Sequence, residues 1–207
     1  MIDLIQKIEQ RLQQPLPGRA AQLRMAHVTR HRYVDAPEGA RQAAVLMALF
    51  PKAGDWHIVL IERNANDRDQ HGGQLSFPGG KAEPSDPSFL DTALREAEEE
   101  VGIAKQTVKI LGGLTDLYIP VSNFQVHPFL GYLEAAPKYQ LQAEEVNQVL
   151  EVPLSQFKLP EVRRQTDIHV NPFITLKNVP YFDLDGRVLW GATAMMLNEL
   201  LELMAGD

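Results

Sequence analysis

The most informative part of the chain is a glycine-led stretch followed by an acidic one, Gly79-Gly80-Lys81-Ala82-Glu83-Pro84-Ser85-Asp86 and, after eight more residues, Arg95-Glu96-Ala97-Glu98-Glu99-Glu100-Val101-Gly102-Ile103. The spacing of apolar residues predicts a helix over residues 87–101 that ends at Gly102. On a helical wheel of about 100° per residue, three carboxylates share one arc and four apolar side chains lie opposite. The carboxylates are Glu96, Glu99 and Glu100, and the apolar residues are Leu90, Leu94, Ala97 and Val101.

Three carboxylates on one helix face repel one another, since like charges four residues apart destabilise a helix. A divalent cation with oxygen ligands would offset this repulsion, and Arg95 could fix the acidic face through pairs along the helix. The alternative is a solvated acidic face, which is the common outcome for a run of charges. The glycine pair upstream favours a ligand site, because glycine lets the backbone approach a ligand closely.

Outside this region, hydrophobic patterns predict strands and two terminal helices. The strands are expected at residues 43–50, 56–63, 74–77, 108–117, 124–133, 146–152 and 179–190. The helices are expected to end near residue 14 and to cover about residues 192–204. Residues 18–39 are polar and are expected to form a loop or an irregular edge strand, and Pro78-Gly79-Gly80 is expected to break the chain.

Helices and strands alternate without a regular βαβ period, which favours an α+β fold with helices against a mixed sheet. The length of 207 residues suits one domain, and no repeat or linker divides it. We therefore expect a single domain over residues 1–207 with an N-terminal helical extension over about residues 1–40.

Composition excludes several classes of function. The chain has no cysteine, so a thiolate metal site and a cysteine nucleophile are both excluded. Its net charge of −7, from 20 basic and 27 acidic residues, argues against broad nucleic-acid binding. No apolar run approaches the ~20 residues that span a bilayer, and the N-terminus does not resemble a signal peptide. A soluble, cytoplasmic protein without a membrane or nucleic-acid partner is the expectation.

The central motif resembles the Nudix box, G-x5-E-x7-R-E-U-x-E-E-x-G-U, in which U is a bulky aliphatic residue. The matching residues are Gly80, Arg95, Glu96, Glu99, Glu100, Gly102 and Ile103. Asp86 stands where the pattern has Glu, and eight residues rather than seven separate it from Arg95. This variant resembles the coenzyme A pyrophosphatase branch of the Nudix hydrolases.

A second pattern upstream is similar to that branch. Leu60, Arg63, Ala65, Gly73 and the run Phe77-Pro78-Gly79-Gly80 fall at its spacing. The chain departs from it at Ile61, Asn64 and Asp69, although Arg68 is adjacent to the missing arginine.

The resemblance implies an α/β/α sandwich with a mixed sheet between helices, and metal-dependent cleavage of a diphosphate. Mg²⁺ or Mn²⁺ would be the cofactor, with Glu96 and Glu100 as direct ligands, Glu99 as ligand or base, and a contribution from the Gly80 carbonyl. The leading substrate is coenzyme A, cleaved to adenosine 3′,5′-bisphosphate and 4′-phosphopantetheine. The alternatives are ADP-ribose, nucleotide sugars or nucleoside triphosphates, and a Nudix fold that only binds nucleotides.

Further residues are candidates for the same site. Arg63, Arg68 and His71 lie just before the box and could bind phosphates together with Gly79 and Gly80, although Arg63, Arg68 and His71 could equally be surface charges. By resemblance, Glu145, beside Glu144, is a candidate base or further metal ligand, and a solvated turn is the alternative. A small-molecule diphosphate is the expected partner, and a homodimer is an open possibility for the assembly.

Overall fold

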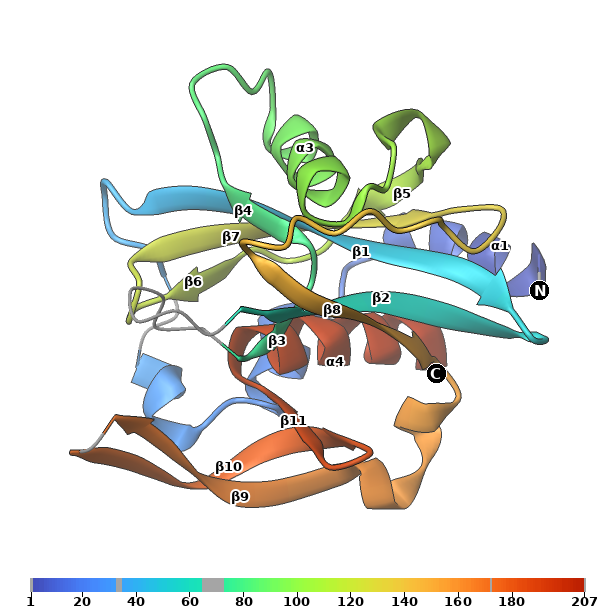
Figure 1. The fold of residues 1–207 in the computed structure, drawn as a ribbon. Coiled ribbons are helices and arrows are strands. Elements are labelled where there is room, and N and C mark those ends of the chain that lie inside the picture. Colours follow the sequence, from blue (N-terminus) through green and yellow to red (C-terminus); the bar gives the residue numbers. More distant parts are fainter. Residues whose placement is uncertain (1, 33–34, 65–72, 172, 207) are drawn as a thin grey trace.

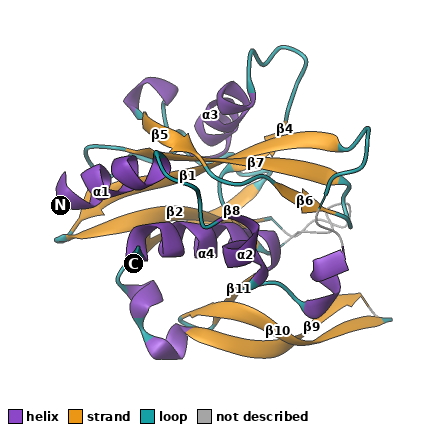
Figure 2. Ribbon diagram, turned by 180° about the vertical axis from the view of Figure 1, so that it is seen from behind, coloured by secondary structure: helices purple, strands orange, loops and turns teal. Residues whose placement is uncertain are grey.

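The computed structural model describes residues 2–32, 35–64, 73–171 and 173–206. It has three layers, with a large mixed sheet between helix α3 on one face and helix α4 on the other (Figures 1 and 2). The helices are α1 (Ile2–Leu12), α2 (Gly18–Leu23), α3 (Phe89–Val101) and α4 (Gly191–Ala205). The strands are β1 (Arg41–Lys52), β2 (Asp55–Arg63), β3 (Leu75–Ser76), β4 (Gly79–Lys81), β5 (Lys109–Gly113), β6 (Leu117–Ile119), β7 (Phe124–Tyr132), β8 (Val146–Pro153), β9 (Arg163–Asn171), β10 (Ile174–Leu184) and β11 (Arg187–Trp190).

The large sheet is mixed because β1 runs parallel to β7 and antiparallel to β2. β1 and β2 pair only near their shared turn, from Leu49 to Lys52 on β1, and then separate. The segment that contains β3 and β4 fills the gap, since β3 pairs with β2 and β4 pairs with β1. The expected α+β class with a mixed sheet between helices is confirmed.

The long apolar run in β1 is explained by burial on both faces. Leu46 and Phe50 belong to the core under α3, whereas Met47 and Leu49 belong to the core on the α4 side. A small antiparallel sheet, β11-β10-β9, lies beyond α4 (Figure 2). In the part of the chain that the structure describes, no helix has the length and apolar character needed to cross a membrane.

Helix α3 closely matches its prediction because its limits are locally encoded. The Ser88 side chain accepts a hydrogen bond from the Asp91 backbone N–H at 3.2 Å, which caps the first turn. Gly102 ends the helix in the left-handed conformation at φ 74°. The predicted hairpin of residues 43–50 and 56–63 and the last helix are also confirmed.

The expectation of a loop or edge strand for residues 18–39 is wrong for residues 18–23 and 28–32, while residues 24–27 and 35–39 are turns and irregular chain. The segment forms α2 and a 3₁₀ turn, Val28–Arg32. Gln22 explains the error, because its polar side chain is fully buried and bonds to distant residues rather than to water. The polar pattern therefore concealed a segment that packs against α4.

Three other predictions need correction. Pro78-Gly79-Gly80 does not simply break the chain, because Gly79 and Gly80 begin β4 and pair with β1. The expected strand at residues 108–117 ends at Gly113, where the Leu114 N–H turns to bond to the Pro128 carbonyl. The strand expected at residues 179–190 is a hairpin, β10 and β11, whose turn contains Gly186 at φ 87°. Strand β9 was not predicted, because its alternating polar sequence lacks a hydrophobic run.

Candidate active site

Two glycines in β4 leave room for their neighbours, Gly80 for the Glu96 side chain of α3 and Gly79 for the backbone of β1. A Cβ atom on Gly80 would lie 2.5 Å from the Glu96 carboxyl carbon. A Cβ on Gly79, whose φ is 155°, would lie 2.4 Å from the Ala44 carbonyl oxygen. Neither distance is sterically possible. Position 79 therefore requires glycine, because the clash is with backbone, whereas a larger residue at position 80 would force the Glu96 side chain to move.

The Glu100 carboxylate is the most buried acidic group of the motif, with 1% of its side chain exposed. It accepts a hydrogen bond from the Gly79 backbone N–H at 2.8 Å, and the Arg63 guanidinium lies 3.4 Å from its other oxygen. Burial raises the pKa of Glu100 to about 7, against the opposing effects of Gly79 and Arg63. The negative charges of Glu96 and Glu145 raise it further.

Glu96 lies beside Glu100 and is partly buried, with 15% of its side chain exposed. Burial raises its pKa, and the charges of Glu99 and Glu145 act in the same direction. Arg95 opposes this effect through an ion pair to Glu96 at 3.0 Å. The site therefore contains more negative charge than its own cations compensate.

Arg95 joins the loop before α3 to the helix itself. Its Nε and Nη2 atoms donate to the two oxygens of Asp86 at 2.9 and 3.0 Å, a bidentate pair. Its Nη1 atom also donates to Glu99 at 2.9 Å. The Arg95 guanidinium holds the pKa of the Asp86 carboxyl well below its usual range. Asp86, at the position where the resemblance departs from the box, thus positions Arg95.

The three glutamates predicted on one helix face therefore have different environments. Glu100 faces the sheet, Glu96 lies at the boundary, and Glu99 is 54% exposed and bonded to Arg95. The wheel correctly placed them in one arc but could not show that β4 covers part of that arc.

Glu145 reaches the same region from the loop before β8. Its carbonyl accepts a hydrogen bond from the Asn64 N–H at 2.8 Å, directly beside Arg63 at the end of β2. Its charge is close enough to raise the pKa of both Glu96 and Glu100. Arg63, 25% exposed, lies against Glu100. Arg68 and His71 lie outside the described residues.

The donor set suits a hard divalent cation, because it consists of carboxylate oxygens with uncompensated negative charge. Glu100 provides a buried carboxylate and Glu96 a partly buried one, and Glu145 adds a third charge nearby. Within residues 2–32, 35–64, 73–171 and 173–206, no three His, Asp or Glu side chains are gathered tightly enough to complete a metal site as they stand. A cation bound at this position would lower the pKa values of Glu96 and Glu100, which burial raises.

Comparison with known proteins identifies the family. Residues 40–172 match the NUDIX domain model, which is more than half of the chain. The chain belongs to the Nudix family. The uncharacterised Nudix hydrolase NudL of Yersinia pestis (strain Pestoides F) is 34% identical over 162 residues, 78% of this chain and 79% of the relative. NudL of Yersinia pseudotuberculosis serotype I has the same identity and coverage.

A solved structure supports the Nudix fold. The crystal structure of a MutT/nudix family protein from Enterococcus faecalis superimposes with a TM-score of 0.51 over 83% of this chain and 65% of that chain, at 13% identity. The carboxylate cluster thus belongs to a Nudix hydrolase, a class of enzyme that uses divalent metal ions to cleave diphosphates.

Proposed function

We propose that this Nudix hydrolase cleaves coenzyme A or its derivatives at the diphosphate, to give adenosine 3′,5′-bisphosphate and 4′-phosphopantetheine. The observation that supports this substrate is the variant box, in which Asp86 and one extra residue precede Arg95. In the structure this variation is accommodated by the bidentate Asp86–Arg95 pair. The similarity of residues 60–80 to the pattern of that branch adds to it.

The proposed metal site contains Glu96 and Glu100, with the Gly80 carbonyl and Glu99 as further candidate ligands. When bound there, Mg²⁺ or Mn²⁺ would polarise a phosphoryl oxygen and lower the pKa of a bound water. Arg63 orients Glu100, and Arg95 holds Glu99 and Glu96 in place. Glu145, exposed at the rim, is the candidate general base, with Glu99 as the alternative.

Hydrolysis of a panel of diphosphates, with and without metal, tests the proposal. The panel contains coenzyme A, 3′-dephospho-coenzyme A, ADP-ribose, a nucleotide sugar and a nucleoside triphosphate. We expect activity only with Mg²⁺ or Mn²⁺ and the highest kcat/KM for coenzyme A. Full activity in excess chelator would refute the metal site, and a higher kcat/KM for ADP-ribose or another panel member would refute the substrate.

Arg68, which lies outside the described residues, is tested by comparing two of these substrates. A charge-assisted contact to the 3′-phosphate contributes about 1.5–3 kcal/mol. Arg68→Ala should therefore lower kcat/KM for coenzyme A roughly tenfold or more while sparing 3′-dephospho-coenzyme A. Equal losses on both substrates would place Arg68 at the diphosphate instead.

A further inference from the structure

The loop between β7 and β8, residues 133–145, is attached to the end of helix α3. The Gln140 N–H donates to the Val101 carbonyl and the Gln142 N–H donates to the Glu100 carbonyl, each at 3.0 Å. These carbonyls belong to the last turn of the helix, where no intrahelical N–H can reach them. The loop therefore caps the helix at the residue that bears the buried carboxylate.

Gly102 allows this attachment for two reasons. Its φ of 74° ends the helix in the left-handed region, which glycine adopts readily. A Cβ atom at this position would also lie 2.9 Å from the Gln140 backbone nitrogen. The glycine that follows the acidic run therefore leaves room for the loop as well as ending the helix.

A turn at the end of the loop brings the side chains of Gln142 and Glu145 together. The Glu145 N–H donates to the Gln142 carbonyl at 3.0 Å, which closes a four-residue turn. Across the same turn, the Gln142 Nε2 atom donates to the Glu145 carboxylate at 3.3 Å. Gln142 thus bonds to Glu100 through its backbone and to Glu145 through its side chain.

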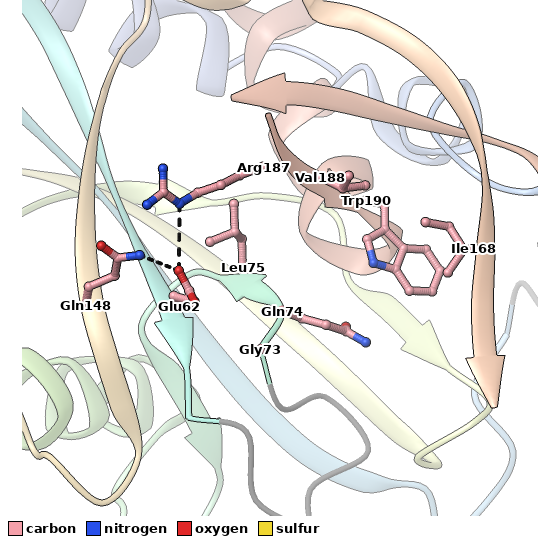
Figure 3. A pocket seen from close by; sticks show the side chains of 9 residues that line it. All are labelled: Glu62, Gly73, Gln74, Leu75, Gln148, Ile168, Arg187, Val188 and Trp190. Carbon is pink, nitrogen blue, oxygen red and sulfur yellow. Dashed lines mark hydrogen bonds and ion pairs between the residues drawn. The ribbon is translucent and has the colours of Figure 1, made fainter. Parts of the chain in front are cut away.

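The chain that follows Glu145 is held by strand β2. Asn147 is an extra residue of β8 in its pairing with β2, a β-bulge of the kind that re-aims nearby side chains. The side-chain amides of Asn147 and Gln148 both donate to the Glu62 carboxylate. Figure 3 shows Gln148 and Glu62 together in the wall of a cavity that Ile168 of β9 also lines. These contacts fix the backbone next to Glu145 but not its carboxylate.

The Glu145 side chain needs such a partner if it acts as a base. It is exposed, and an exposed glutamate side chain samples several rotamers. A general base must lie within hydrogen-bond reach of the proton that it accepts. A donor that favours one rotamer therefore raises the fraction of time in which the base is correctly placed.

We propose that Gln142 is a positioning residue, which orients the Glu145 carboxylate from the end of helix α3. The proposal rests on the proposed function, in which Glu145 is the candidate general base. Because its backbone bonds to Glu100, Gln142 fixes the base relative to the helix that carries the metal-site carboxylates.

A pair of matched variants tests the proposal. Gln142→Met has a similar size and keeps the backbone bond to Glu100 but loses the amide donor. We expect kcat to fall about five- to fiftyfold with KM within about twofold of the wild type, because the side chain acts on the base rather than on substrate binding. A rise in KM with an unchanged kcat would overturn the proposal.

Gln140→Met is the control, because Gln140 also bonds to α3 through its backbone. Its side chain is exposed and forms no hydrogen bond to the described residues. Both kinetic constants should stay within about twofold of the wild type, since no contact to a candidate catalytic group is lost. Urea denaturation should give the two variants the same midpoint.

A double-mutant cycle with Glu145→Ala tests whether Gln142 acts through Glu145. In the Glu145→Ala background, Gln142→Met should lower kcat by less than about twofold, because no carboxylate remains to be positioned. A fall by the same factor in both backgrounds would overturn the proposal. Together with a lower urea midpoint for Gln142→Met, it would assign Gln142 a structural role only.

Failure of this proposal and failure of the proposed function have different signatures. The cycle uses whichever diphosphate of the panel is cleaved, so it does not depend on coenzyme A as the substrate. If Glu145→Ala keeps the wild-type kcat, the base assignment is wrong and the role of Gln142 falls with it. If Glu145→Ala lowers kcat but Gln142→Met does not, the base assignment stands and the positioning role is wrong.

Discussion

Glu100 shows how a single carboxylate can combine stability and function. Its side chain is almost fully buried, and burial raises its pKa to about 7 although Gly79 and Arg63 favour the charged form. In the metal-free protein a proton and a cation therefore compete for the same group near neutral pH. Without a cation, the charged form of such a buried acid destabilises the folded protein. With a cation, the same carboxylate is a strong ligand.

The pH dependence of stability follows from the sign of this shift. The folded-state pKa lies above the unfolded value, so between about pH 4.5 and 7 the folded protein binds more protons than the unfolded chain. The free energy of unfolding of the metal-free protein should fall as pH rises through this window. Glu100 contributes about 3 kcal/mol at most to this fall. Glu100→Gln should therefore remove much of it.

Urea denaturation in chelator at pH 5 and pH 8 measures this effect. We expect Glu100→Gln to be more stable than the wild type at pH 8 and similar to it at pH 5. The same variant should lower metal-dependent turnover by orders of magnitude, because an amide is a weak metal ligand. If the free energy of unfolding of Glu100→Gln changed with pH as it does in the wild type, the charge of Glu100 would not destabilise the folded protein.

Glu145 is tested against its neighbour Glu144, which gives a matched pair. Both are exposed, but only the Glu145 charge is identified as raising the pKa of Glu96 and Glu100. Glu145→Gln should lower kcat by about 10²–10⁴-fold if this group is the general base. Glu144→Gln should leave kcat within about threefold of the wild type. A larger loss of kcat in Glu144→Gln than in Glu145→Gln would identify Glu144 as the general base instead.

At the scale of elements, the contact between β4 and α3 positions the carboxylates. The segment of β3 and β4 fills the gap between the diverging strands β1 and β2, and Gly80 of β4 leaves room for the Glu96 side chain of the helix. Asp86 and Arg95 lock the loop that joins the two elements. The geometry of the site is therefore a property of this packed unit rather than of the helix alone.

Gly80→Ala tests this packing. The new Cβ would lie 2.5 Å from the Glu96 carboxyl carbon, so Glu96 must move away. We expect a loss of at least tenfold in kcat/KM and weaker activation by metal, since misplacement of a group by about 1 Å can cost a hundredfold. Gly113→Ala is the control, because its Cβ would meet only ordinary contacts at 3.7 Å or more. Equal activity of the two variants would contradict the role of Gly80.

At the scale of the whole molecule, a buried polar group joins the N-terminal segment to the Nudix domain. The fully buried Glu199 of α4 accepts hydrogen bonds from the Gln22 amide at 2.8 Å and from the Thr115 hydroxyl at 2.6 Å. Gln22 also donates to the Thr115 carbonyl at 2.7 Å. These bonds link α2, α4 and the segment between β5 and β6, which are far apart in the sequence.

Gln22→Met tests this link with a side chain of similar size. It removes a donor to Glu199, which leaves a buried carboxylate with fewer partners, and should lower the free energy of unfolding by about 1–3 kcal/mol. Arg24→Ala removes an exposed ion pair to Glu202 and should change it by less than about 1 kcal/mol. Chemical denaturation of both variants measures the difference, and similar losses would argue against the buried link.

Local patterns were enough to predict several elements of this protein. The periodicity of residues 87–101, with Gly102 after it, located α3 within two residues at its start, because a cap and an apolar stripe are local features. The β1–β2 hairpin and α4 followed from apolar runs bounded by turn residues. The composition of the motif also indicated a carboxylate site, since the residues that define it lie close together in the sequence.

Long-range packing decided the features that the patterns missed. Residues 18–23 form helix α2, in which Gln22 bonds to Glu199 across 177 positions, although the polarity of the segment suggested a loop or an edge strand. The burial of Glu100 depends on the backbone of Gly79 and the side chain of Arg63, and the cavity beside Glu62 depends on the unpredicted strand β9. A helical wheel orders side chains around one axis, whereas exposure, pKa and cavities depend on what the rest of the chain places against that axis.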